Sequence, residues 1–240
     1  MDRRFLAILG AVIIIFIGIF AISQNSNNKN NTGGGSQAQA TKHIEGQGSA
    51  GVTLVEYGDY ECPICEEYYQ PLKQAAANYS SQIYFQFRNL PLTSIHPNAF
   101  AAARAAEAAG LQGKYWQMHD KLYENQNDWV SQSNPQSTFD QYAKDIGLNV
   151  SQFNTDYASS KVNNAINADL AAFAKTGQQQ ATPTFFLDGV YIDNTKLIDS
   201  QTNLPTAAKI GSVLKAEIDK KTSASKSTSS QSSASSGNPY

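Results

Sequence analysis

Cysteine is nearly absent from this chain: 2 of its 240 residues are cysteines, Cys62 and Cys65. A framework of several structural disulfides is therefore excluded. A tetrahedral zinc site is also disfavoured, because it needs four ligands, usually from two such pairs or from one pair and a paired set of histidines. The 3 histidines of the chain are scattered, at His43, His96 and His119.

Covalent haem attachment is excluded by the residue that follows the cysteine pair. That chemistry requires a histidine directly after the second cysteine of a C-x-x-C motif, and Glu66 occupies this position. The spacing also makes a weak structural staple, because closing a four-residue loop contributes only about 2 kcal/mol, against about 3 kcal/mol for fifteen residues. Two interpretations of the cysteine pair remain: two inert buried thiols, or a redox-active pair.

An excess of charge of either sign is lacking as well. The formal net charge at pH 7 is −2, from 18 Lys and Arg residues and 20 Asp and Glu residues. This balance gives no electrostatic basis for holding a polyanion. We therefore expect no nucleic-acid partner.

Charged residues are missing altogether from the segment Phe5 to Ile22. Its length of about 18 residues reaches the threshold for a membrane-spanning helix and exceeds the usual core of a signal peptide. Arg3 and Arg4 precede it, which places the head, residues 1–4, in the cytoplasm. The sequence therefore predicts a single-pass transmembrane anchor at residues 5–22. A signal peptide cleaved near Ser23 is the alternative.

Two other segments hold little that a core could bury. Residues 23–42 are mostly Asn, Ser, Gln and Gly, which is typical of a flexible linker. Residues 222–240 are rich in serine, which predicts a disordered tail. The remaining residues, 43–221, are enough for one domain with its own core.

The cysteine pair stands where a strand is predicted to pass into a helix. The strand is the mostly apolar run Val52 to Gly58, and the helical pattern begins at Pro63, which has no N–H to lose in a first turn. The unpaired N–H groups and the dipole of that helix end would stabilise a thiolate at Cys62 and lower its pKa. Cys65 would lie within reach to attack a mixed disulfide at Cys62. This context favours redox chemistry.

Strand patterns recur only near the two ends of the domain. After a second strand at Ile83 to Arg88, the pattern is helical without a break, over Pro97 to Ala109, Lys114 to Tyr123, Thr138 to Ile146 and Ser151 to Lys175. A hairpin with an Asp-Gly turn is then predicted at Phe185 to Ile192. An amphipathic helix from Pro205 to Lys221 closes the domain.

This order, strand, helix, strand, helical block, hairpin, helix, resembles the DsbA-like thiol:disulfide oxidoreductases of the thioredoxin-fold superfamily, specifically their membrane-tethered type. The resemblance covers residues 44–221, and its motifs are Val55 to Cys65, Arg88 to Leu92, His96-Pro97 and Ala181 to Phe186. It implies an α/β thioredoxin-like fold with an inserted helical subdomain at about residues 95–178, preceded by one N-terminal transmembrane helix.

The resemblance also implies roles for single residues. Cys62 would be the exposed nucleophile and Cys65 the resolving cysteine. Glu56 would lie buried under Cys62 and take part in proton transfer. Pro183 would follow a cis peptide bond and face the disulfide, and Thr182 would offer its backbone to an extended substrate. No cofactor and no metal is implied beyond the Cys62–Cys65 disulfide.

One departure from the family pattern bears on redox strength. The strong oxidants of the family carry histidine before the resolving cysteine, where this chain has Ile64. Glu61, Glu66 and Glu67 also bring negative charge, which opposes a thiolate. We therefore expect a milder oxidant.

The predicted function is an extracytoplasmic thiol:disulfide oxidoreductase of a bacterial cell envelope, which introduces disulfides into secreted or envelope proteins. Its partners would be unfolded cysteine-containing substrates and a quinone-linked membrane protein that reoxidises it. We expect a monomer held in the cell membrane by its N-terminal helix. Two alternatives stay open: an envelope thiol reductase of the same fold, and a non-enzymatic tethered binding module.

Overall fold

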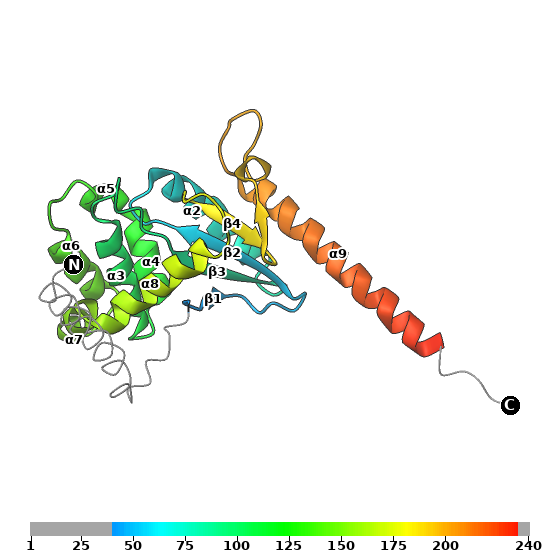
Figure 1. The fold of residues 1–240 in the computed structure, drawn as a ribbon, viewed down its shortest axis with the longest axis horizontal. Helices are drawn as coiled ribbons and strands as arrows, with labels where there is room; N and C mark the ends of the chain where they lie inside the picture. Colours follow the sequence, from blue (N-terminus) through cyan, green and yellow to red (C-terminus); the bar gives the residue numbers. More distant parts are fainter. Residues whose placement is uncertain (1–39, 235–240) are drawn as a thin grey trace, which may run out of the picture. The chain divides into compact units, whose positions relative to one another are not determined.

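The computed structural model describes residues 40–234, with side chains described for residues 40–225 (Figure 1). Its centre is a five-stranded sheet in the order β1-β3-β2-β4-β5. The strands β2 and β3 run parallel, and the other neighbouring pairs run antiparallel. The strands are β1 (His43–Glu45), β2 (Val52–Gly58), β3 (Ile83–Asn89), β4 (Thr184–Leu187) and β5 (Val190–Ile192).

Helices pack on both faces of this sheet. The helices α2 and α9 pack on one another and α9 also contacts β2, while α8 contacts β3. The described helices are α2 (Pro63–Asn78), α3 (Ala99–Gly110), α4 (Tyr115–Glu124), α5 (Gln126–Trp129), α6 (Gln136–Asp145), α7 (Val150–Tyr157), α8 (Ser160–Ala174), α9 (Ala207–Ala234) and the 3-10 helix η1 (Asn194–Lys196). The helices α3 to α8 fall between β3 and β4, within the range expected for the insert.

The buried side chains form two main clusters. The larger one lies among the insert helices, where the alanines of α3 let neighbouring helices come close, and it contains the fully buried Trp129. The smaller one lies between the sheet, α2 and α9, and includes Leu54, Leu72 and Leu214. Trp116 is partly buried and packs against both clusters.

The predicted hairpin is present, with the predicted turn. Asp188 and Gly189 connect β4 to β5 with φ angles of 51° and 81°. Both angles lie in the left-handed region that Asp and Gly tolerate best, which is why the Asp-Gly pair is a reliable hairpin signal.

The predicted boundary between the closing helix and a disordered tail at residue 222 is wrong. The helix α9 continues to Ala234 instead of ending at Lys221. The sequence offers no helix breaker there, because residues 222–234 contain neither Gly nor Pro. Serine and threonine lower helix propensity by only about half a kcal/mol each relative to alanine.

The predicted start of the domain at residue 43 is also corrected. Thr41, which was assigned to the linker 23–42, is 8% exposed and bonded into the domain. Its N–H and its hydroxyl each donate to the Asp169 carboxylate at 2.7 Å, and Gln86 donates to its carbonyl oxygen at 2.7 Å. Local composition could not reveal this, because the partners lie far along the chain.

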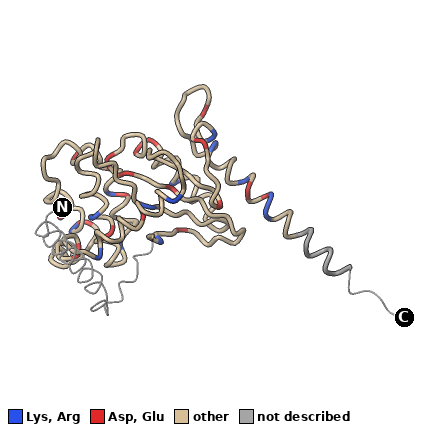
Figure 2. Tube along the Cα trace, viewed as in Figure 1, with Lys and Arg blue, Asp and Glu red and all other residues tan. Residues whose placement is uncertain are grey.

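The head, the predicted transmembrane span at residues 5–22 and the linker up to residue 39 lie outside the described residues. Of the helices in the described part of the chain, none is both long enough and apolar enough to span a bilayer. Lys and Arg lie interspersed with Asp and Glu along the described chain (Figure 2). On α9, for example, Lys215 pairs with Asp219 and Lys220 with Glu217.

Candidate active site

The cysteine pair is held just beyond the end of β2. Gly58 is the last residue of that strand, and a Cβ atom there would lie 2.4 Å from the ring of Phe87 and 3.1 Å from Oε1 of Glu56. A side chain at this position would therefore displace the groups that lie beneath the motif.

Asp59 fixes the turn that leads from β2 to the cysteines. It is 1% exposed, and its Oδ1 accepts a hydrogen bond from the N–H of Glu61 at 2.8 Å. Its Oδ2 accepts from the N–H of Leu92 at 2.9 Å and lies 2.7 Å from Nδ1 of His96. One buried carboxylate thus ties the motif to the loop after β3. An Asp that bonds the N–H two residues ahead is a common turn former, but its second partner lies too far away in sequence to be predicted.

Cys62 is the N-cap residue of α2 and is 5% exposed. The expectation of an exposed nucleophile is therefore corrected. Neighbouring backbone covers the thiol: its Sγ lies 3.5 Å from the carbonyl oxygen of Thr182. Gln126, from α5, donates to the carbonyl oxygens of Tyr60 at 2.8 Å and Cys62 at 3.0 Å, which holds this corner against the insert.

The surroundings of the two thiols shift their pKa values in opposite directions. A hydrogen bond from the Cys65 thiol is the largest cause that lowers the pKa of Cys62. With the side chain of Thr182 and the amides of Cys65 and Ile64 at the helix start, it outweighs burial and brings this pKa to about 6. Burial and the adjacent Cys62 raise the pKa of Cys65, which is 0% exposed. Both cysteines are free thiols in this structure. The low pKa predicted for Cys62 is confirmed, although its first cause is the partner thiol rather than the helix end.

Glu56 lies on β2 in the same alternation as the buried Val52 and Leu54, and it is 3% exposed. The predicted burial is confirmed. Burial, and then the charge of Cys62, raises the pKa of this carboxyl to about 8. The charge of Glu56 in turn raises the pKa of Cys65, so the carboxyl is electrostatically coupled to both cysteines. A group whose pKa lies near neutral pH can both give and take a proton.

Thr182 and Pro183 lie beside Cys62, as the resemblance implied. The peptide bond between them is cis. The carbonyl oxygen of Pro183 accepts a hydrogen bond from the side-chain amide of Asn194 at 2.9 Å, which anchors the loop before β4. The structure thus gathers all five predicted site residues, from β2, α2 and the loop before β4, around one point.

The acidic residues beside the motif do not all face the thiols. Glu61 is buried, and its Oε2 accepts a hydrogen bond from the N–H of Asn98 at 2.6 Å, next to the start of α3. Glu66 and Glu67 are exposed. The side chain of Ile64 is 46% exposed and forms an apolar rim beside Cys62. Within residues 40–234, no group of three or more His, Cys, Asp or Glu residues is placed to hold a metal ion.

A family model described as Thioredoxin matches residues 38–204. Among solved structures, oxidised BdbD from Bacillus subtilis is similar with a TM-score of 0.62 at 21% identity, over 76% of this chain and 97% of that chain. The α-DsbA1 protein of Wolbachia pipientis has a TM-score of 0.60 at 18% identity, over 75% and 92% of the two chains. A thioredoxin-like oxidoreductase from Silicibacter pomeroyi DSS-3 has a TM-score of 0.56 at 23% identity, over 75% and 91%. These likenesses show the fold.

Curated relatives are more similar in sequence but much longer. Proteins named Na(+)/H(+) antiporter NhaA 1, from Mycolicibacterium vanbaalenii and Mycolicibacterium gilvum, are each 38% identical, over 152 and 151 residues. The match covers 62% and 61% of this chain but only 23% of each relative. The chain therefore spans about a quarter of the length of the curated relatives that it matches.

Proposed function

Because this chain belongs to the thioredoxin family, we propose that it is a thiol:disulfide oxidoreductase that exchanges disulfides with protein substrates through Cys62 and Cys65. The observation that carries the proposal is that the pKa values of the two thiols are shifted in opposite directions. The pKa of Cys62 is lowered to about 6, so this sulfur is a thiolate at neutral pH, whereas the pKa of Cys65 is raised and its sulfur keeps its proton.

The low pKa of Cys62 also supports the direction of exchange. Lowering a thiol pKa from 9.0 to about 6 stabilises the reduced protein. Each unit is worth about 1.4 kcal/mol, or about 30 mV in the potential of this couple. A stabilised reduced form makes the disulfide a better oxidant. We therefore propose that the protein introduces disulfides, more mildly than relatives with histidine in place of Ile64.

The proposed reaction proceeds through a mixed disulfide. A substrate thiolate attacks Sγ of Cys62, the Cys62–Cys65 bond breaks, and Cys65 leaves as a thiolate that takes a proton from Glu56. A second substrate thiolate then attacks the substrate sulfur of the mixed disulfide. Cys62 leaves as a thiolate, which its low pKa favours, and the substrate departs oxidised. The two electrons remain on the Cys62–Cys65 dithiol.

Partners and location complete the proposal. A quinone-linked membrane protein would remove the electrons from the dithiol, and no cofactor is needed beyond the cysteine pair. Thr182 would pair with an extended substrate beside Cys62, where its carbonyl oxygen already lies. The domain would work outside the cytoplasm of a bacterial cell, held at the cell membrane by residues 5–22. The antiport named for the curated relatives is not carried over to this chain.

Equilibration against glutathione buffers tests the proposal. The expected result is a Cys62–Cys65 couple whose potential is more oxidising than that of a structural disulfide, together with catalysed oxidation of a reduced, unfolded protein. The Cys62→Ser variant should lose the catalysis. A couple as reducing as that of thioredoxin, about −270 mV, would identify the reductase alternative. Bound metal with no exchange activity would identify the binding module.

A further inference from the structure

A small cavity of about 50 Å³ lies under α2 on the inner side of the motif. Its inner wall contains Glu56 from β2 and His119 from α4, and both side chains are buried. Its outer wall contains Tyr69, Lys73 and Asp120, and the carboxyl-bearing Glu45 of β1 also lines the cavity. The volume has room for at least one water molecule. The cavity therefore reaches from the carboxyl beneath the cysteines towards the surface between α2 and α4.

His119 gives this cavity an unusual polar wall. The residue is 4% exposed, and within the described residues neither ring nitrogen has a hydrogen-bond partner. Asp120 comes nearest, with Oδ1 3.6 Å from Nδ1. Burial lowers the pKa of the ring, so it is neutral and carries one donor and one acceptor nitrogen. Buried polar atoms nearly always have partners, and a water molecule in the cavity would provide one.

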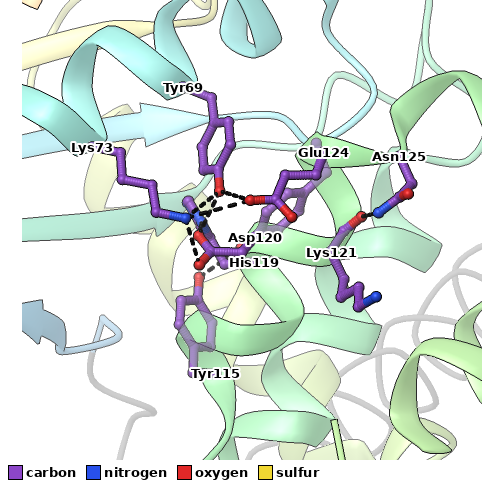
Figure 3. A network of polar contacts seen from close by, with 9 residues as sticks. Tyr69, Lys73, Tyr115, His119, Asp120, Lys121, Glu124 and Asn125 are labelled. Atoms are coloured by element: carbon purple, nitrogen blue, oxygen red, sulfur yellow. Dashed lines mark hydrogen bonds and ion pairs between the residues drawn. The ribbon is translucent and has the colours of Figure 1, made fainter. Parts of the chain in front are cut away.

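A cluster of hydrogen-bonded polar groups lies at the outer wall (Figure 3). The hydroxyl of Tyr69 lies 2.8 Å from Oδ1 of Asp120 and 2.9 Å from Oε1 of Glu124, and it donates to one of them at a time. The ammonium group of Lys73 donates to the Tyr69 hydroxyl and to Oδ2 of Asp120, both at 2.8 Å. The side chains of Lys73 and Glu124 are each 45% exposed. The cluster thus connects the cavity to solvent.

We propose that this cavity and the Tyr69–Lys73–Asp120–Glu124 cluster form the route by which Glu56 exchanges its proton with solvent, and that His119 positions the water that begins the route. The inference rests on the proposed dithiol exchange. In that reaction Glu56 gives a proton to the Cys65 thiolate. Burial raises its pKa to about 8, so at neutral pH the carboxylate takes a proton back from solvent, and a proton leaves again when the dithiol is reoxidised. No electrons move along the route.

The side of Glu56 towards the cysteines is closed, which makes a second route necessary. Cys65 is 0% exposed and Cys62 is 5% exposed, and a substrate bound at Cys62 and Thr182 would cover this side further. The backbone of Glu56 is paired within the sheet. Its carboxyl, however, has no hydrogen-bond partner within residues 40–225, so it has no direct protein relay. A path from the opposite side lets the proton return while the mixed disulfide is still in place.

Filling the cavity tests the route. Ala76 lines the cavity on α2, and Ala76→Leu would occupy the space. The matched control is Ala77→Leu, because Ala77 is the next residue on the same helix, is exposed and does not line the cavity. Oxidised protein is mixed with excess substrate dithiol in weak buffer, and disulfide reduction and free protons, read by a pH-indicator dye, are followed in one turnover. The two substrate thiols release up to two protons, and the proton uptake measured here is the return of one of them to Glu56.

In Ala76→Leu we expect proton uptake to be at least about tenfold slower than disulfide reduction. Losing an acid–base group altogether slows a reaction by about 10²–10⁴, and some passage of protons around the new side chain would make the effect smaller. The wild type and Ala77→Leu should show no lag, and the glutathione equilibrium should be the same in all three proteins. A merely structural effect would shift that equilibrium or the unfolding midpoint without separating the two rates.

Two variants keep the proposal testable if Ala76→Leu does not fold. His119→Phe keeps an aromatic ring but removes both nitrogens, and Asp120→Asn removes the carboxylate that faces both Tyr69 and Lys73. Each should produce the same lag. Proton uptake in step with disulfide reduction in every folded variant would overturn the route. A wild-type protein without any disulfide exchange would instead overturn the proposed function on which the route rests.

Discussion

Two chemically identical thiols differ in this structure because of what each one touches. Cys62 receives a hydrogen bond from Cys65 and the amides at the start of α2, whereas Cys65 is enclosed and keeps its proton. Glu56, under the pair, has a pKa of about 8 because it is buried. Environments that push pKa values apart mark the donor and acceptor in acid–base chemistry.

The first prediction concerns the hydrogen bond from Cys65. Since this bond is the largest cause of the low pKa of Cys62, Cys65→Ala should raise that pKa towards 9.0. Cys65→Ser keeps a donor in the same place and is the matched control, with a pKa that should stay low. The ultraviolet absorbance of the thiolate, followed with pH, measures both. Equal pKa values in the two variants would show that the hydrogen bond from Cys65 is not needed, and that the side chain of Thr182 and the helix-end amides lower the pKa.

The second prediction concerns stability and pH at Glu56. The carboxyl has a pKa of about 8 in the folded protein against 4.5 ordinarily. Between these values the folded protein holds a proton that the unfolded chain has lost, so the free energy of unfolding falls as pH rises, by on the order of 4–5 kcal/mol in total. Glu56→Gln removes this slope, so the variant should gain stability over its parent from about pH 4.5 to pH 8.

Cys62 has the opposite effect over an overlapping range. Its pKa is lowered from 9.0 to about 6 in the folded protein, so its contribution to stability rises with pH between those values. The Glu56→Gln comparison is therefore made by urea unfolding of reduced protein in a Cys62→Ser background. This background removes the smaller of the two causes that raise the Glu56 pKa, so the slope should end below pH 8 and its total should fall below the roughly 4–5 kcal/mol of the parent. Parallel pH profiles with and without Glu56 would mean that its carboxyl titrates normally.

At the scale of the secondary-structure elements, the helical insert helps to hold the cysteine motif in place. Gln126 from α5 is 7% exposed and donates to two backbone carbonyls of the motif, those of Tyr60 and Cys62. The insert thus contributes directly to the position of the nucleophile, in addition to adding buried surface.

The third prediction tests this contact. Gln126→Leu leaves the buried carbonyl group of Tyr60 without a donor, whereas that of Cys62 keeps the N–H of Glu66 at 3.2 Å. An unsatisfied buried group costs about 1–3 kcal/mol, so the unfolding free energy should fall by about that amount. Cys62 should also react faster with a small alkylating reagent, because its corner loosens. Asn127→Leu, at the exposed neighbouring position on α5, is the control and should change neither quantity. Unchanged stability in Gln126→Leu would mean that the carbonyl of Tyr60 finds another donor.

The elements that the sequence predicts well are the long periodic ones. The strand β2 has the predicted bounds, and α2 begins at the predicted Pro63, because apolar alternation and a proline in the first turn are local signals. Strand β1 and helices α5 and η1, three or four residues each, give no periodicity to detect. The burial of Cys62 and the roles of Asp59 and Gln126 depend on contacts between distant segments, which composition and spacing do not encode.

Across the whole described domain, the N-terminal segment is bound to the insert by buried charge. Asp169 of α8 is 0% exposed, and it accepts hydrogen bonds from Thr41 and from the backbone and side chain of Asn89. Glu107 of α3 bonds His43 at 2.8 Å and Asn89 at 2.7 Å. Residues at the start of the domain thus complete a buried polar network that joins β3, α3 and α8.

The fourth prediction follows from this network. A chain that starts at residue 46 lacks the strand β1, and its Asp169 keeps the donors of Asn89 but loses the two of Thr41. Removing a partner from a buried charge costs up to roughly 3–5 kcal/mol. The urea midpoint of this chain should therefore fall well below that of a chain that starts at residue 40, which retains every described contact. Equal midpoints would show that neither β1 nor the two donors of Thr41 add to stability. Asp169→Asn in both chains provides the control, because the difference between them should shrink when the charge is gone.

The two tryptophans divide between the packed regions of the domain. Trp129 lies wholly inside the helical cluster, where its indole N–H donates to the carbonyl oxygen of Leu122 at 3.0 Å and its ring packs edge-on against Phe139. Trp116 instead packs against Phe85 of the sheet. The emission of a Trp116→Phe protein would therefore come from the insert alone, and that of Trp129→Phe from the border with the sheet. Between them, the two indoles form a built-in pair of optical reporters that would reveal whether insert and sheet open as one unit or in sequence.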